Sequence, residues 1–208
     1  MIGIIDYGMG NLLSVKNALD YLGEESEIIN DADSIRKVKK IVLPGVGSFP
    51  DCMNNLNERG FVEILNELVL EKKIPILGIC LGMQIMGETS HEMGESEGLG
   101  WFEGDVIKME PQNESIKIPN IGWETISIVP GDHLLSSFNT LPDFYFVHSY
   151  YLKCSRNQDV TSTYLLGDQI ITASIQKDNI YGTQFHPEKS SDHGLEVLTN
   201  FIEIKIDG

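Results

Sequence analysis

Three residues have the types and spacing needed for covalent catalysis: Cys80, His186 and Glu188. A cysteine thiolate can attack a carbonyl carbon, a histidine can move the protons, and a carboxylate can hold the imidazole in place. His186 and Glu188 are two residues apart, so in extended chain both side chains lie on one side. We therefore predict a nucleophilic triad.

The residues around Cys80 form a nucleophile-elbow pattern, Gly78-Ile79-Cys80-Leu81-Gly82, with cysteine in the place of the usual serine. Glycines two before and two after the nucleophile allow a sharp turn without Cβ clashes. The apolar run before Cys80 predicts a strand, and residues 81–88 predict a helix whose N-terminus favours the thiolate. The alternative is a buried core thiol, which the flanking glycines and a downstream base argue against.

His186 stands where a predicted strand, residues 180–185, must stop, because Pro187 has no N–H to continue a ladder. A lone His-Pro-Glu sequence is more often a turn than a site. The Cys80 elbow in the same chain favours the functional interpretation.

Strands and helices must alternate to bring these residues together. Apolar runs at residues 2–6, 27–30, 39–43 and 74–79 predict strands, and residues 12–22, 32–38, 48–59 and 61–71 predict helices. This alternation indicates an α/β fold with a parallel sheet covered by helices on both faces.

The pattern changes in the second half. A polar loop over residues 89–100 is followed by short β segments, by hairpin turns at Asp168 and Asp178, and by a helix over residues 194–204. The β segments are predicted at residues 104–109, 125–129, 144–149, 160–164, 170–176 and 180–185. We expect an antiparallel extension of the same sheet, and a single domain over residues 1–208, because no linker or repeat interrupts the chain.

The composition sets limits on partners. The net charge of −16 argues against nucleic acid or an anionic membrane as the main partner. The three cysteines have no metal-type spacing, and no apolar run approaches the ~20 residues of a membrane span. The N-terminus has no basic region before an apolar one, so we expect a reduced, cytoplasmic protein without a metal or cofactor.

The elbow and the His186-Pro187-Glu188 sequence resemble those of the class I glutamine amidotransferases. Three further stretches, residues 4–12, 43–49 and 146–150, are similar to the glutaminase subunits of imidazole glycerol phosphate synthase. The resemblance runs from Met1 to about Phe201. It implies a three-layer, flavodoxin-like fold and hydrolysis of glutamine to glutamate and ammonia. It also implies a heterodimer with a HisF-type (β/α)₈ cyclase, which uses the ammonia to make imidazole glycerol phosphate and AICAR for histidine biosynthesis.

The resemblance also implies roles for individual residues. The backbone N–H groups of Leu81 and Val46 would form the oxyanion hole, and Val46 lies between two glycines that leave its peptide free to rotate. Glutamine would be bound by Gly45, Gly47, Gln84, Glu92, Ser149 and Tyr150. The surface facing the cyclase would include Asn11, Asn120, Trp123, Glu124 and Lys189, where Lys189 would gate ammonia passage. His148 is expected to be structural, and His91, His133 and His193 to lie at the surface.

Other functions stay open. Synthase subunits usually read Pro-His-Met-Gly-Trp-Asn where this chain has Pro119-Asn120-Ile121-Gly122-Trp123-Glu124. A paralogous glutaminase that supplies ammonia for amination of a nucleotide sugar in surface-polysaccharide biosynthesis is therefore an alternative. If Glu124 faces the partner, its charge predicts a cationic or hydrogen-bonding group opposite. A class I-like cysteine peptidase and an inactive binding module are further alternatives from other classes.

Overall fold

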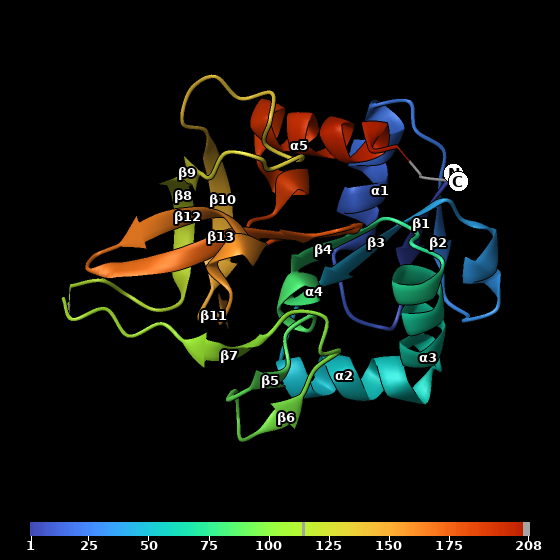
Figure 1. Cartoon of the computed structure of the whole chain (residues 1–208), viewed down its shortest axis with the longest axis horizontal. Helices are drawn as coiled ribbons and strands as arrows, with labels where there is room; N and C mark the ends of the chain where they lie inside the picture. Colours follow the sequence, from blue (N-terminus) through green and yellow to red (C-terminus); the bar gives the residue numbers. More distant parts are fainter. Residues whose placement is uncertain (114, 206–208) are drawn as a thin grey trace.

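The computed structural model describes residues 1–113 and 115–205, and its centre is an eight-stranded mixed sheet (Figure 1). The strand order is β2-β1-β3-β4-β14-β13-β12-β9. The first five strands in this order are parallel, and the last three run antiparallel to their neighbours. The sheet is therefore a doubly wound core with an antiparallel extension.

The strands of this sheet are β1 (Ile2–Ile5), β2 (Ser26–Ile29), β3 (Lys40–Gly45), β4 (Ile76–Cys80), β9 (Ser127–Ile128), β12 (Val160–Leu166), β13 (Gln169–Lys177) and β14 (Ile180–Thr183). The helices are α1 (Leu12–Tyr21), α2 (Phe49–Glu58), α3 (Phe61–Asn66), α4 (Leu81–Gln84) and α5 (Ser191–Glu203).

Helices cover the sheet on both faces, as the alternation predicts. Strands β1, β3, β4 and β14 are buried along their whole length, as strands covered on two sides must be. One face packs against α1 and α5 and the other against α2 and α3 (Figure 1). The three-layer α/β fold is confirmed.

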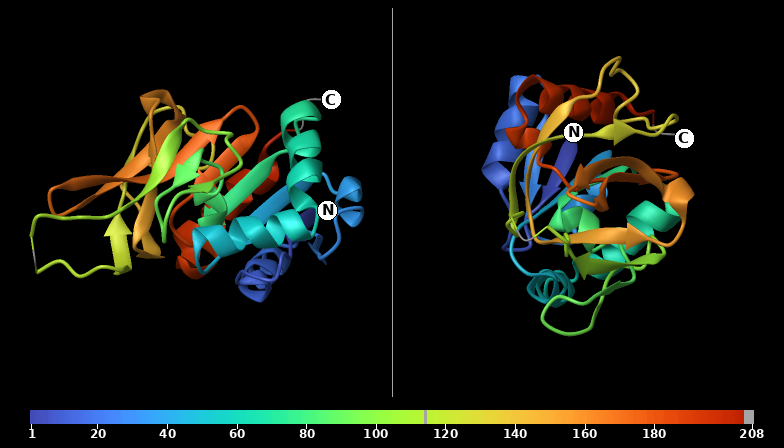
Figure 2. Two further views of the ribbon diagram at one scale, coloured as in Figure 1. Left: turned by 90° about the horizontal axis from the view of Figure 1, so that it is seen from below. Right: turned by 90° about the vertical axis from the view of Figure 1, so that its left-hand side faces the viewer.

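The prediction of one continuous antiparallel extension is wrong in part. Strands β12, β13 and β9 do extend the main sheet, but the remaining strands form two smaller sheets. One pairs β8 (Asn120–Thr125) with β10 (Asp143–His148). The other contains β11 (Tyr150–Cys154), β7 (Gly104–Lys108), β5 (Thr89–Ser90) and β6 (Ser96–Glu97). Figure 2 shows these strands gathered at one end of the molecule, away from α1 and α3. Short half-buried strands do not specify their neighbours, so the sequence could not separate the sheets.

Several predicted boundaries are also corrected. The helix after Cys80 ends at Gln84 and not at residue 88, because the chain turns there to reach β5. Residues 32–38 contain only a 3₁₀ turn, Ser34–Lys37, and α5 begins at Ser191. The segment expected to be a polar loop carries the β5–β6 hairpin. Strand β11 was not predicted, and only Thr125 of β8 falls within a predicted strand. The turns at Asp168 and Asp178 are confirmed.

Across residues 1–113 and 115–205, none of the helices combines the length and the apolar character that crossing a membrane requires.

Candidate active site

The three predicted catalytic residues meet at the carboxyl edge of the parallel sheet. Strand β4 ends at Cys80, and its neighbours are β3 on one side and β14 on the other. Gly45 is the register partner of Cys80, so the segment after β3 lies beside the nucleophile. His186 follows β14 by three residues. A pocket of about 320 Å³ opens there, lined by the segments of Cys80 and His186 and by four others, around Val46, Glu92, Pro119 and Ser149. This edge is where α/β folds bind ligands.

The elbow depends on its glycines. Cys80 has φ of 55° and ψ of −110°, a left-handed conformation that non-glycine residues rarely adopt and that here projects the thiol from the sheet. A Cβ on Gly82 would lie 1.8 Å from the Leu43 carbonyl oxygen, and one on Gly78 would lie 2.6 Å from the Gly82 carbonyl oxygen. The elbow motif therefore reflects close backbone packing as well as backbone freedom.

The Cys80 side chain is buried, yet it lines the pocket. Its Sγ lies 3.6 Å from Nε2 of Gln184 and 4.0 Å from the carbonyl oxygen of Val147. The thiol of Cys52 differs: it lies on the buried side of helix α2 and is fully buried, which raises its pKa to about 12. Only Cys80 among the three cysteines lines this pocket in the described part of the chain.

The imidazole of His186 is held by a carboxylate. Its Nδ1 lies 2.9 Å from Oε1 of Glu188. Burial lowers the pKa of His186, but the Cys80 thiolate and the Glu188 carboxylate outweigh it and raise that pKa to about 9. Nε2 of His186 and Oε2 of Glu188 are buried without a hydrogen-bond partner in the described residues. A buried imidazole with its outer nitrogen unpaired is suited to exchange protons with a ligand.

Asn11, which sequence reasoning assigned to the partner surface, also touches this carboxylate. Its Nδ2 lies 3.4 Å from Oε1 of Glu188, while Ser14 donates to its Oδ1 at 2.8 Å. The loop between β1 and α1 thus contacts the triad. Nothing in the sequence signals this contact, because the two residues are 177 positions apart.

The Pro44–Gly47 segment forms one wall of the pocket. Val46 is 41% exposed and lines it together with Gly47 and Leu81. Gly47 has φ of 98°, a conformation that favours glycine. Gly45 packs so closely that a Cβ there would lie 2.6 Å from the Gly82 backbone nitrogen. The two segments expected to form the oxyanion hole are therefore adjacent.

Five of the six residues expected to bind glutamine line the pocket, namely Gly47, Gln84, Glu92, Ser149 and Tyr150, whereas Gly45 is not part of its lining. The Gln84 side chain is buried, and its Nε2 donates to the Tyr150 carbonyl at 2.8 Å and to Oε1 of Gln184 at 3.0 Å. Oε2 of Glu92 accepts from the Phe49 backbone N–H at the start of α2 at 2.8 Å. Gln184, which links Gln84 to Cys80, was missed by sequence reasoning, because a buried amide after a strand carries no functional signal.

The residues expected to face a partner divide over two sides of strand β8. Ile121 and Trp123 are 60% and 51% exposed and point outward. Asn120 and Glu124 alternate with them and point to the other side, where Nδ2 of Asn120 donates to the Tyr164 hydroxyl at 3.2 Å. Lys189 is exposed and lines the mouth of the pocket.

The other histidines lie away from the nucleophile, apart from His148. His91 and His133 are exposed, whereas His193 is half-buried and its ring lies edge-on to Phe138. His148 lines the pocket and is buried; both of its ring nitrogens are hydrogen-bonded within the protein.

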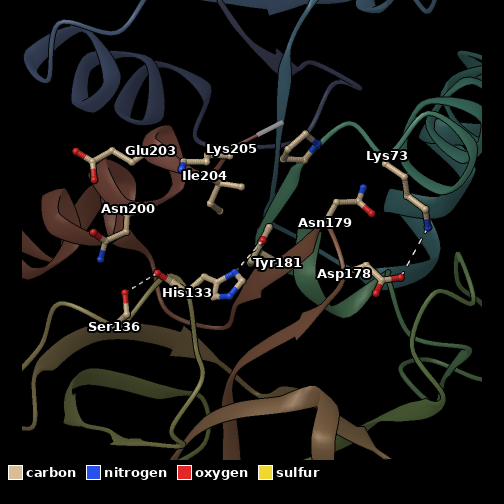
Figure 3. A pocket seen from close by; sticks show the side chains of 11 residues that line it. Lys73, His133, Ser136, Asp178, Asn179, Tyr181, Asn200, Glu203, Ile204 and Lys205 are labelled. Carbon is tan, nitrogen blue, oxygen red and sulfur yellow. Dashed lines mark hydrogen bonds and ion pairs between the residues drawn. The ribbon is translucent and has the colours of Figure 1, made fainter. Parts of the chain in front are cut away.

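A larger hollow of about 670 Å³ lies elsewhere. Its lining includes Pro75 and Asn179, just before β4 and β14 begin, so it is at the amino edge of the sheet, at the other end of these strands from Cys80. Figure 3 shows its polar lining, with His133 near Tyr181 and an ion pair between Lys73 and Asp178. It contains none of the three triad residues, so size alone does not identify the site.

Comparison with known proteins agrees with the fold and the motifs. The model of the class-I glutamine amidotransferase family matches residues 3–204. Imidazole glycerol phosphate synthase subunit HisH 1 of Campylobacter jejuni is 47% identical over 204 residues, which cover 98% of this chain and all of that protein. Subunit HisH of Leptospira interrogans is 42% identical over 206 residues, with 98% and 100% covered. Among solved structures, PurLQS from Thermotoga maritima has a TM-score of 0.76 at 18% identity, with 97% of this chain and 96% of that chain covered. At that identity the likeness concerns the fold alone.

Proposed function

The chain belongs to the class I glutamine amidotransferase family, and we propose that it is the glutaminase subunit of an imidazole glycerol phosphate synthase. The observation that carries the proposal is that Cys80 and His186 line one pocket at the carboxyl edge of the sheet, with Glu188 hydrogen-bonded to His186 behind it. The HisH subunits at 40–47% identity over nearly the full chain support the histidine-biosynthesis assignment.

In the proposed reaction the Cys80 thiolate attacks the side-chain amide carbon of glutamine. A C–S bond forms, and the carbonyl electrons move to oxygen. The His186 cation then gives its Nε2 proton to the nitrogen, the C–N bond breaks, and ammonia leaves a thioester. Neutral His186 next takes a proton from water, whose oxygen attacks the thioester carbon. Collapse of this second intermediate breaks the C–S bond and releases glutamate. Glu188 keeps the imidazole oriented throughout.

Both tetrahedral intermediates need hydrogen-bond donors for the oxyanion. We assign one to the Leu81 backbone N–H, directly after the nucleophile, and the other to Val46. Val46 lies between Gly45 and Gly47, and its side chain is partly exposed, so neither neighbour has a Cβ that would oppose rotation of its peptide. Losing one such donor costs about 3–4 kcal/mol in the transition state. Rotation of this peptide can therefore switch the enzyme.

Different residues of the pocket would bind different groups of glutamine. The Glu92 carboxylate, fixed by the Phe49 N–H, would bind the α-ammonium group. The oxygen of the Gln84 amide is left for the substrate, because its nitrogen is occupied by Tyr150 and Gln184. The backbone at Gly47, Ser149 and Tyr150 would complete the site. No cofactor or metal takes part in this scheme.

The partner we propose is a HisF-type (β/α)₈ cyclase that forms a heterodimer with this chain and receives the ammonia. Ile121 and Trp123 form an exposed apolar strip on β8, and Lys189 and Asn11 lie at the pocket mouth and beside the triad. A cyclase covering this edge would close the pocket from water. We place the whole activity in one domain, residues 1–208.

The departures from the usual subfamily motif fall mainly on the inward side of β8. Asn120 donates to Tyr164, and Glu124 lies on the same side of the strand, so neither changes the outward strip. Ile121 replaces one apolar residue with another at the exposed position. This geometry favours the histidine-pathway partner over the surface-polysaccharide paralogue, and it removes the need for a cation opposite Glu124.

The test is complementation of a histidine auxotroph that lacks this subunit, with the chain's own cyclase co-expressed. Growth without histidine supports the proposal. Failure to grow, together with glutamine-dependent amination of a nucleotide sugar by another partner, would support the polysaccharide alternative. Cleavage of peptides in preference to glutamine would support a cysteine peptidase.

A further inference from the structure

A chain of hydrogen bonds between buried side chains runs from strand β8 to the wall of the glutamine pocket. Nδ2 of Asn120 lies 3.2 Å from the Tyr164 hydroxyl, which lies 2.9 Å from Nε2 of His148. Nδ1 of His148 in turn lies 2.8 Å from the carbonyl oxygen of Tyr150. Four strands, β8, β12, β10 and β11, which belong to the three sheets, are joined in this way.

Each bond in the chain has only one possible direction. The Tyr150 carbonyl can only accept, so Nδ1 of His148 carries the proton. Burial lowers the pKa of His148 to about 4, so the ring is neutral and its Nε2 is an acceptor. The Tyr164 hydroxyl therefore donates to His148 at 2.9 Å, a better acceptor than the Met109 sulfur at 3.7 Å, and its oxygen accepts from Asn120. Removing that hydroxyl leaves buried groups on both sides unpaired.

At its other end, this series of hydrogen bonds fixes a backbone turn beside Cys80. Ser149 alone joins β10 to β11, and the Tyr150 carbonyl just after it also accepts from Nε2 of Gln84 at 2.8 Å. With both acceptor positions of this carbonyl occupied, the peptide cannot rotate without breaking two partly buried hydrogen bonds. Ser149 and Tyr150 line the pocket, whereas Tyr164 does not.

We propose that Tyr164 is a positioning residue for glutamine binding: through His148 it fixes the backbone at Ser149 and Tyr150, and Asn120 ties this position to strand β8. The proposal rests on the glutaminase function proposed above. It assigns Tyr164 no contact with the reacting atoms.

The first test is Tyr164→Phe in the full chain with its cyclase. The substitution keeps the ring, whose centroid lies 4.5 Å from that of Phe146, and removes only the hydroxyl. Losing an uncharged hydrogen bond that holds the binding site should raise KM for glutamine about fivefold and leave kcat within about twofold. Tyr151→Phe is the matched control, because Tyr151 is similarly buried and its hydroxyl has no hydrogen bond in the described residues; KM should not change.

The second test asks whether Asn120 acts through Tyr164. Asn120→Leu should also raise KM for glutamine. The double variant should have the same KM as Tyr164→Phe alone, because both substitutions interrupt the same series of hydrogen bonds. The rate of Cys80 alkylation by iodoacetamide should equal that of the wild type in all three variants. Thermal unfolding of each variant reports whether it folds.

An unchanged KM in Tyr164→Phe would overturn the proposal, as would strictly additive effects in the double variant. A parallel fall of kcat and alkylation rate would reveal general damage to the fold and would also overturn it. Failure of the proposed function looks different: the wild-type complex would then hydrolyse no glutamine at all, and the positioning role would be lost with it.

Discussion

The Nδ1 atom of His186 lies 2.9 Å from Oε1 of Glu188, and both side chains are almost completely buried. A carboxylate in this position stabilises the imidazolium, which in the reaction that we propose is the form that protonates departing ammonia. Asn11 approaches the same oxygen, so the loop after β1 contributes to holding the base. The pH dependence of the reaction follows from this pair.

We expect the glutaminase rate to fall on the alkaline side as His186 loses its proton. The Cys80 thiolate and the Glu188 carboxylate raise the pKa of His186 to about 9 against the effect of burial, so the cation persists through neutral pH and is lost as pH rises through that value. A kcat profile between pH 6 and pH 10 measures this. A rate that declines well below pH 8 would contradict the raised pKa.

Glu188→Gln should move this alkaline limb to lower pH, because the charge that stabilises the cation is gone. It should also reduce kcat by about 10²–10⁴-fold, the range typical of general acid–base groups. Asp192→Asn removes a nearby but exposed carboxylate, and should leave both the profile and kcat unchanged. Equal profiles for Glu188→Gln and the wild type would argue against the proposed orienting role.

Glu92→Gln should weaken glutamine binding. The amide oxygen can still accept from the Phe49 N–H, so the loop stays in place while the charge facing the substrate ammonium is lost. A hydrogen bond to a charged group is worth about 1.5–3 kcal/mol, so KM should rise about 10- to 100-fold with a small effect on kcat. Steady-state kinetics decide this; an unchanged KM would exclude Glu92 from the ammonium site.

Gly82→Ala should distort the elbow. The added methyl would meet the Leu43 carbonyl oxygen at 1.8 Å, and backbone cannot yield as a flexible side chain can. Overpacking of this kind costs about 1–3 kcal/mol or more, and the displaced thiol should lose most of its activity. Gly122→Ala is the control, since a Cβ there meets nothing within 4 Å. Denaturant unfolding of both variants, followed by glutaminase assays, measures the difference; equal stability would contradict the packing argument.

Trp123→Ala should weaken cyclase binding by about 2 kcal/mol or more, as expected for an aromatic residue at the centre of an interface. The isolated chain should keep its glutaminase activity, because Trp123 does not line the pocket. Ile170→Ala, an exposed apolar residue on the β12–β13 hairpin, should bind the cyclase normally. Calorimetric titration compares the two, and equal affinities would place the interface elsewhere.

The triad could be predicted because its signals are local. Two glycines around Cys80 and the His186-Pro187-Glu188 sequence restrict the backbone within a few residues. The parallel pairing of β4 with β14 then brings these two segments side by side. The oxyanion role of Val46 came from the resemblance to the family, and it stays a prediction.

Contacts that depend on distant pairing could not be predicted. Gln184 reaches Cys80, and Tyr164 reaches His148, only because β12, β13 and β14 lie where the folded sheet puts them. The inward direction of Asn120 depends on the pairing of β8 with β10, which short half-buried strands do not specify.

The most direct test of the central claim is the nitrogen source used by Cys80→Ser in complex with its cyclase. We predict that synthesis of imidazole glycerol phosphate from ammonium salts stays near the wild-type rate, while synthesis from glutamine is lost. Cys154→Ser, at a thiol that lies outside the pocket, should support both reactions. Glutamine-dependent synthesis at the wild-type rate in Cys80→Ser would contradict the claim that this thiol is the nucleophile of a glutaminase.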